Sequence, residues 1–180
     1  MKRIVVVSDL HLGDERGSLR EKSITSSFVE EIKDVKTIIL LGDIFDLSMA
    51  SLSESVKCAR VFFEELKNLE LDEIVYLPGN HDHHLLVLET EYKDIIQTML
   101  NGGIPKLPDY IREFRGKESF ISGILPDSLK DKLVVKYPNH KIKIENKTYL
   151  FHHGHYLSRE GSLLAKTSEA IKKGISLNEF

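Results

Sequence analysis

Three apolar runs in the first half of the chain are each followed by a short motif of acidic and histidine residues. The runs occupy residues 3–7, 37–41 and 73–77, and the motifs are Asp9-Leu10-His11, Gly42-Asp43-Ile44-Phe45-Asp46 and Gly79-Asn80-His81-Asp82. Aliphatic and β-branched runs of this length predict buried parallel strands. Ligands bind outside the carboxyl ends of such strands. The pattern therefore predicts that all three motifs meet at one edge of a sheet.

The spacing of the motifs supports an α/β fold. Asp43 follows Asp9 by 34 residues, and Asn80 follows Asp43 by 37, which suits one strand–helix–strand unit per step. Apolar residues at helical spacing predict helices over residues 19–33, 51–68 and 84–100, with Ser51 or Ser53 as the N-cap of the second. Right-handed crossovers would return every motif to the same edge.

The second half of the chain has a different pattern. Glycines and prolines within residues 101–131 predict a loop-rich insertion with a short helix near 127–132, and this insertion is either a lid or a surface excursion. Residues 133–137 and 140–152 are expected to form strands of an antiparallel sheet, with a tight turn at Glu145-Asn146. A terminal helix is expected within residues 157–180, at about 160–173. We expect residues 1–180 to form a single domain.

Composition and charge narrow the class of protein. The chain has 180 residues, of which 41% are hydrophobic and 29% charged, and its net charge of −3 argues against a general nucleic-acid-binding surface. Its one cysteine, Cys58, rules out a disulfide framework within the chain. With no run long enough for a membrane span and no apolar signal segment, we expect a cytoplasmic protein.

The residue types in the motifs indicate a metal centre. Asp9 and His11 can face one ion, and Asp43 has two oxygens with which to bridge two ions. Asn80 and His153 can complete the second side. Carboxylate, imidazole and amide oxygen together suit divalent manganese, iron or zinc. Two such ions about 3.5–4 Å apart would clamp a phosphate and activate water for in-line attack.

His81, Asp46 and Asn80 are the candidate catalytic residues. His81 lies beside a ligand and can protonate the leaving oxygen or stabilise charge on the phosphoryl group. Asp46 can accept a hydrogen bond from His81, which would orient the ring and favour its charged form.

These motifs resemble the calcineurin-like metallophosphoesterase family. The resemblance covers residue 2 to about residue 157 and rests on Asp-x-His, Gly-Asp-x-x-Asp, Gly-Asn-His-Asp and His153-Gly154-His155. It implies a four-layer αββα sandwich. It also implies one metal held by Asp9, His11 and Asp43 and a second held by Asp43, Asn80 and His153, with Mn²⁺ expected first and Fe, Zn or Ni as alternatives. Gly-Asn-His-Asp-His-His-Leu is similar to the UDP-2,3-diacylglucosamine pyrophosphohydrolase branch.

The last block of the family pattern, Gly-His-x-His, does not occur after residue 155. In the family this block supplies one further ligand to each metal, so the fold is expected to be shortened at its C-terminal side. Three explanations stay open: a truncated or split reading frame, ligands from a partner chain or a second copy, or a site that works with water in those positions.

Three functions follow from these observations. The first is a two-metal phosphoesterase that hydrolyses a phosphodiester, phosphomonoester or diphosphate bond of a small phosphorylated substrate. The second is a weakly active or non-catalytic interaction module on the same fold, because a shortened fold would leave a sheet edge and an apolar helix face for a partner. The third is a nuclease-like phosphodiesterase, which the negative net charge disfavours.

Overall fold

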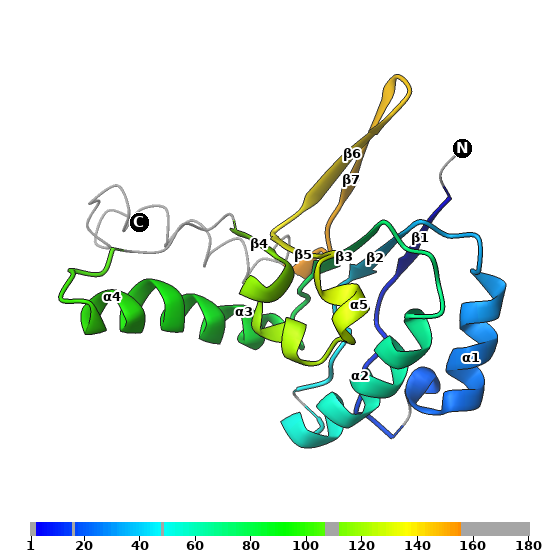
Figure 1. The fold of residues 1–180 in the computed structure, drawn as a ribbon, viewed down its shortest axis with the longest axis horizontal. Helices are drawn as coiled ribbons and strands as arrows, with labels where there is room; N and C mark the ends of the chain where they lie inside the picture. The colour runs from blue at the N-terminus through cyan, green and yellow to red at the C-terminus, as the bar shows by residue number, and fades with distance from the viewer. Residues whose placement is uncertain (1–2, 16, 48, 107–111, 156–180) are drawn as a thin grey trace.

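The computed structural model describes residues 3–15, 17–47, 49–106 and 112–155, and its centre is a five-stranded sheet in the order β1-β2-β3-β5-β4 (Figure 1). The strands are β1 (Ile4–Val7), β2 (Thr37–Leu41), β3 (Glu73–Leu77), β4 (Arg112–Arg115) and β5 (Leu133–Tyr137). Strands β1, β2, β3 and β5 are parallel, and β4 pairs antiparallel with β5. The three parallel strands predicted before the motifs are confirmed.

Two amphipathic helices cover one face of this sheet. The 3-10 turn η1 (Ser18–Arg20) leads into α1 (Lys22–Glu31), and α2 (Leu52–Leu66) lies beside α1 (Figure 1). The hydroxyl of Ser51 accepts a hydrogen bond from the backbone N–H of Glu54 at 3.2 Å, which confirms the predicted cap. Alternate strand residues such as Ile38 and Leu40 pack with Phe62 in the main core.

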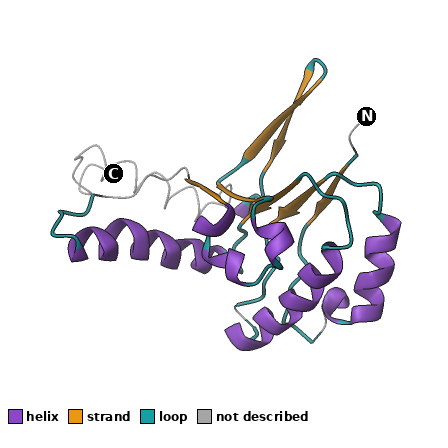
Figure 2. Ribbon diagram, viewed as in Figure 1, coloured by secondary structure: helices purple, strands orange, loops and turns teal. Residues whose placement is uncertain are grey.

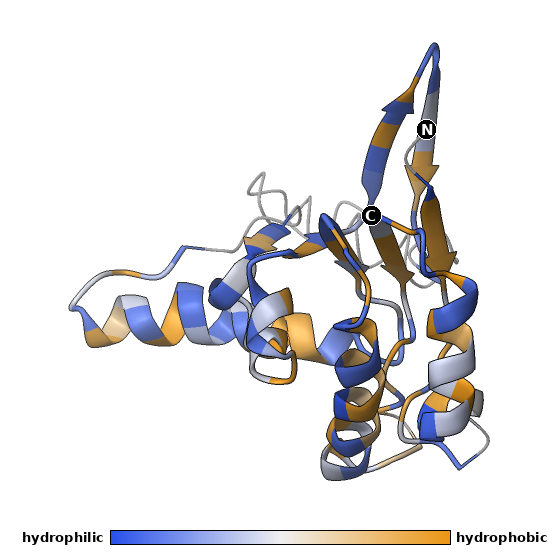
Figure 3. Ribbon diagram, turned by 45° about the vertical axis from the view of Figure 1, so that its right-hand side comes forward, coloured by the Kyte–Doolittle hydropathy of each residue, from blue (hydrophilic) through white to orange (hydrophobic). Residues whose placement is uncertain are grey.

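The opposite face of the sheet carries a β-hairpin. It consists of β6 (His140–Ile144) and β7 (Lys147–Phe151), joined at Glu145-Asn146 as predicted (Figure 2). Ile142 and Phe151 pack against a small core formed by Ile39, Val75 and Leu77. The central strands are coloured mostly hydrophobic, whereas the tip of the hairpin is hydrophilic (Figure 3). The hairpin therefore contacts the sheet near its base.

The α/β fold class is confirmed, with helices flanking a parallel-rich sheet, but the predicted sheet assignment of residues 133–137 is wrong. Strand β5 joins the central sheet in parallel with β3, because its run Leu-Val-Val-Lys-Tyr is nearly all buried and requires neighbours on both sides. Only β6 and β7 form the separate antiparallel sheet, so the second sheet in the described residues is a hairpin.

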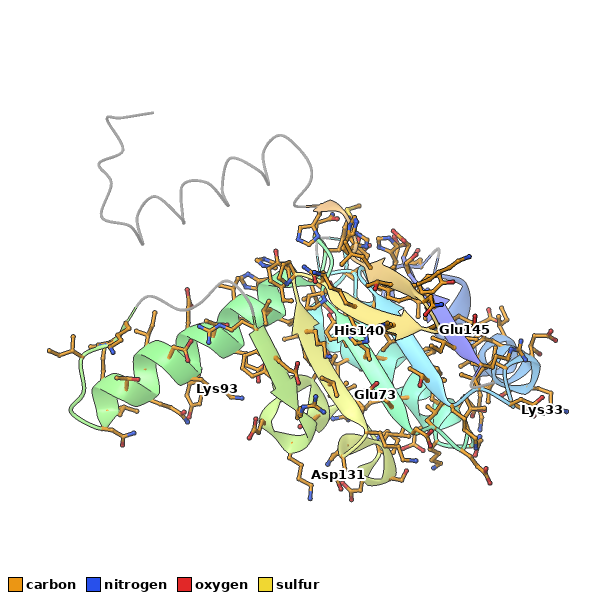
Figure 4. All side chains as sticks on the ribbon, turned by 90° about the horizontal axis from the view of Figure 1, so that it is seen from above. Lys33, Glu73, Lys93, Asp131, His140 and Glu145 are labelled. Atoms are coloured by element: carbon orange, nitrogen blue, oxygen red, sulfur yellow. The ribbon has the colours of Figure 1, made fainter. Side chains whose placement is uncertain are left out.

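A long helix leads away from the sheet where the third motif ends. It begins as α3 (His83–Thr90), continues as the π-helical segment η2 (Glu91–Ile96) and ends as α4 (Gln97–Leu100). Arg112 pairs with Asp94, and the Lys93 ammonium lies 4.5 Å from the ring centre of Phe114, so the helix is tied to β4 (Figure 4).

The predicted insertion at 101–131 contributes to the core. Its described part contains β4, the 3-10 turns η3 (Gly116–Glu118) and η4 (Phe120–Gly123), and α5 (Asp127–Lys130). Ile121, Leu125 and Leu129 are buried in the main core. A role as a lid stays a prediction, and the terminal helix expected at 160–173 lies outside the described residues. Across the described ranges, every helix is too short or too polar to cross a membrane.

Candidate metal centre

The segments that follow β1 and β2 stay paired beyond the ends of the strands. The backbone N–H groups of Asp9, His11 and Leu12 donate to the carbonyl oxygens of Gly42, Asp43 and Ile44 at 3.0, 3.0 and 2.8 Å. Both motifs are therefore held side by side at the carboxyl edge of the sheet, where the sequence predicts them.

Three of the predicted metal ligands have left-handed backbone conformations. Asp9, His11 and Asp43 have φ angles of 56°, 47° and 52°. Non-glycine residues rarely adopt this region, and such strain clusters at functional sites. Each of the three offers a ligand atom, and these atoms lie within 4.8 Å of one another. The structure thus brings together the three residues expected to hold the first ion.

The residues expected to hold the second ion also converge. Nε2 of His153 lies 3.2 Å from Oδ2 of Asp43 and 3.2 Å from Oδ1 of Asn80. Its Nδ1 lies 3.0 Å from the carbonyl oxygen of Leu41, so Nδ1 carries a proton and donates it. In neutral His153 the lone pair of Nε2 would then face two oxygens that only accept. A proton on Nε2 or a cation among these atoms resolves this conflict, and a carboxylate, an amide oxygen and an imidazole together are a donor set that fits a divalent metal.

Two glycines allow the loops of the candidate centre to approach closely. A Cβ atom on Gly42, which has a φ of +80°, would lie 2.2 Å from Nδ1 of His153. A Cβ atom on Gly79 would lie 2.2 Å from Oδ1 of Asp43. A side chain at either position would displace a candidate ligand.

His81 and Asp46 form the predicted pair. Nδ1 of His81 lies 3.1 Å from Oδ1 of Asp46, and this hydrogen bond raises the pKa of His81 above its ordinary value. The other carboxylate oxygen, Oδ2, lies 3.3 Å from Nδ1 of His11. The sequence did not suggest this second contact. His11, Asp46 and His81 therefore form an alternative group that could hold one ion.

Asp82 is a structural residue of the site to which the sequence analysis assigned no role. Its carboxylate is fully buried and accepts hydrogen bonds from the backbone N–H groups of Gly79 at 2.5 Å and of Ile44 at 2.8 Å. Oδ1 of Asp43 accepts a hydrogen bond from the backbone N–H of His81 at 2.9 Å. Two carboxylates thus join the second motif to the third. The sequence signal that could have identified Asp82 is its place as the last residue of the motif Gly-Asn-His-Asp.

A cleft of about 450 Å³ opens beside the first ligand group. Its polar lining residues are Asp9, His11, Asp14, Asp46 and His81. Its apolar lining residues are Leu10, Leu19 and Met49, which the sequence analysis did not identify and which are called the apolar wall below.

His155 lies close to the centre but in a separate ring cluster. Its Nε2 is 3.2 Å from the Tyr137 hydroxyl, and its ring centre is 5.8 Å from that of His83 and 5.7 Å from that of His153. Burial lowers the pKa of His155 to about 4. Among the described residues, His155 belongs to neither group of candidate metal ligands.

The sequence matches the model of a known protein family. A family model described as calcineurin-like phosphoesterase matches residues 2–173, a range that includes every candidate ligand. No curated protein shows significant similarity to the chain. The family match extends over nearly the whole sequence, and the chain therefore belongs to the calcineurin-like phosphoesterase family.

Proposed function

We propose that this protein is a phosphoesterase that uses two divalent metal ions, with Mn²⁺ the first to test. Asp9, His11 and Asp43 would hold one ion, and Asp43, Asn80 and His153 the other. The observation that carries the proposal is the convergence of Asp43, Asn80 and His153, whose carboxylate, amide oxygen and imidazole together suit a divalent metal. Bound ions would neutralise the phosphate charge and make a water molecule nucleophilic.

The side chains around the candidate ligands have separate roles in this proposal. Asp43 joins the two groups because Oδ1 is fixed by the N–H of His81 while Oδ2 faces His153. His81 would donate its proton to the leaving oxygen, and Asp46 would keep the ring oriented and protonated. Asn80 would supply a neutral oxygen to the second ion and help to position the phosphate.

Each proposed ligand group contains three protein side chains. Three ligands leave coordination positions for water and substrate, as in other catalytic metal sites. We propose a small phosphorylated substrate and not nucleic acid, given the net charge of −3.

Hydrolysis of bis(p-nitrophenyl) phosphate with added Mn²⁺ tests the proposal. Asp43→Asn retains the size of the side chain but removes the charge shared by both groups. We expect turnover that requires metal and falls on the order of a hundredfold or more in the variant. The proposal would be contradicted if the wild-type protein showed no more turnover than a folded Asp43→Asn protein.

A specific observation also favours a role in association. Leu88, Tyr92, Ile96 and Met99 are 47–60% exposed and follow helical spacing along α3, η2 and α4. An apolar helix face of this kind is typical of a surface that meets a partner chain or a second copy. Sedimentation velocity across micromolar concentrations tests this second function: a concentration-dependent dimer supports it, and a monomer throughout contradicts it.

A further inference from the structure

The cleft of about 450 Å³ lies on the His81 side of the candidate metal centre. In an in-line displacement the leaving oxygen departs opposite the attacking water. The group that protonates this oxygen must lie within hydrogen-bond reach of it. If His81 is that acid, the part of the substrate that leaves must occupy the cleft beside His81.

The lining of this cleft combines the polar residues of the centre and Asp14 with three apolar side chains, Leu10, Leu19 and Met49. Leu10 and Leu19 are half-buried, with part of each side chain packed on the main core, and Met49 is 70% exposed. A neighbouring cleft of about 500 Å³ shares Met49 and Asp14 with this one, but the rest of its lining includes Glu15, Arg20 and Glu54. Of these two clefts, the one at His81 is the one to which Leu10 and Leu19 contribute.

We infer that the leaving group of the natural substrate is an apolar alcohol or phenol, which binds against Leu10, Leu19 and Met49. This inference rests on the proposed function, since it places the scissile phosphate at the metal centre and the leaving oxygen at His81. The volume of the cleft lies in the range of small-molecule sites. Met49 is the most exposed of the three and would therefore contact the bound group with the least support from the core, which makes it the residue to vary.

Binding of two phosphonates to the Mn²⁺-loaded protein tests the inference by calorimetry, without turnover. Methylphosphonate and phenylphosphonate share the group that meets the metals and differ in the apolar group that would enter the cleft. Burial of each CH₂ equivalent contributes a factor of about four in affinity. We expect phenylphosphonate to bind at least about tenfold more tightly than methylphosphonate.

Met49→Gln is the informative variant, since glutamine keeps the length of the side chain and makes its end polar. Met49 is exposed and outside the main core, so the variant should fold. Leu100→Gln is the control, because Leu100 is also exposed, at 78%, and lies on α4 outside the cleft. The preference for phenylphosphonate should fall at least about threefold in Met49→Gln and stay unchanged in Leu100→Gln.

Equal affinity for the two phosphonates would overturn the inference, as would a preference that Met49→Gln leaves intact. Hydrolysis of bis(p-nitrophenyl) phosphate by the same preparations separates this failure from failure of the proposed function. Metal-dependent turnover that Asp43→Asn abolishes, together with equal phosphonate affinities, would retain the function and reject the apolar leaving group. Absence of both turnover and phosphonate binding would reject the two together.

Discussion

At the scale of single residues, Asp46 has the most unusual position. One of its oxygens lies 3.1 Å from Nδ1 of His81, and the other lies 3.3 Å from Nδ1 of His11. A buried carboxylate with an imidazole at each oxygen can orient a metal ligand and a proton donor together. In the proposed mechanism it would thereby couple metal binding to proton transfer.

Asp46→Asn should shift the pH dependence of turnover. The hydrogen bond to Asp46 is the largest cause that raises the pKa of His81. His81 is active as an acid only while protonated, so activity is lost as pH rises through that pKa. Removal of the carboxylate lowers the pKa, and the alkaline limb of the profile of kcat against pH should move to lower pH. Metal content of the variant is the control, and an unmoved limb with full metal content would contradict the role of Asp46.

The convergence of the candidate ligands could be predicted from the sequence because each follows a recognisable strand. The second contact of Asp46, with His11, could not be predicted. It depends on the left-handed φ of 47° at His11, which the residue type does not indicate. The same holds for the apolar wall, since Leu10, Leu19 and Met49 come from three different segments.

At the scale of elements, the loop after β2 and the turn after β3 act as one unit. Asp82 accepts hydrogen bonds from Gly79 and Ile44, and Asp43 accepts one from His81. The Ile44–Asp82 and Asp43–His81 bonds each join residues 38 positions apart in sequence, whereas the Gly79–Asp82 bond lies within the turn after β3. The relative position of Asp43 and Asn80 therefore depends on Asp82.

Asp82→Asn should weaken metal binding although Asp82 is not a candidate metal ligand. An amide offers one acceptor oxygen where the carboxylate offers two, so at least one buried N–H loses its partner at a cost of about 1–3 kcal/mol. We expect affinity for Mn²⁺ to fall about 10–100-fold, measured by calorimetry on the folded protein. The matched control is Glu89→Gln, which changes a buried acid paired with Lys93 at 3.0 Å, outside the candidate ligand groups. Equal Mn²⁺ affinity in both variants would show that Asp82 does not position the ligands.

Strand placement from sequence succeeded where the pattern was strong and local. The runs before the three motifs and the hairpin at Glu145-Asn146 were both predictable. Strand β4 was not, because Arg-Glu-Phe-Arg has one buried apolar residue, Phe114, and is a strand only through its pairing with β5. The partner strand of β5 could not be predicted from the local sequence pattern either, because its parallel pairing with β3 joins segments far apart in the chain.

At the scale of the whole molecule, buried histidines should set the response of stability to acid. Burial lowers the pKa of His155 to about 4, and burial also lowers the pKa values of His83 and His140. Below the ordinary histidine value of 6.5, the unfolded chain takes up protons that the folded chain does not. The free energy of unfolding should therefore decrease as pH falls from 6.5 towards 4.

His155→Gln isolates the largest of these contributions. Glutamine cannot titrate in this range, so the decrease in the free energy of unfolding between pH 6.5 and 4 should become smaller. Urea unfolding of the metal-free protein at several pH values measures the slope. The buried carboxyl of Asp82, whose pKa is raised, acts in the opposite direction but is present in both proteins. An identical slope in the variant would contradict the account of His155.

An anomalous difference map from crystals grown with Mn²⁺ tests the central proposal most directly. The two-metal account predicts two peaks about 3.5–4 Å apart, on either side of Asp43. One peak should contact Asp9 and His11, and the other should contact Asn80 and His153. A single peak among His11, Asp46 and His81, the alternative ligand group, would contradict the account, and so would a map without a peak.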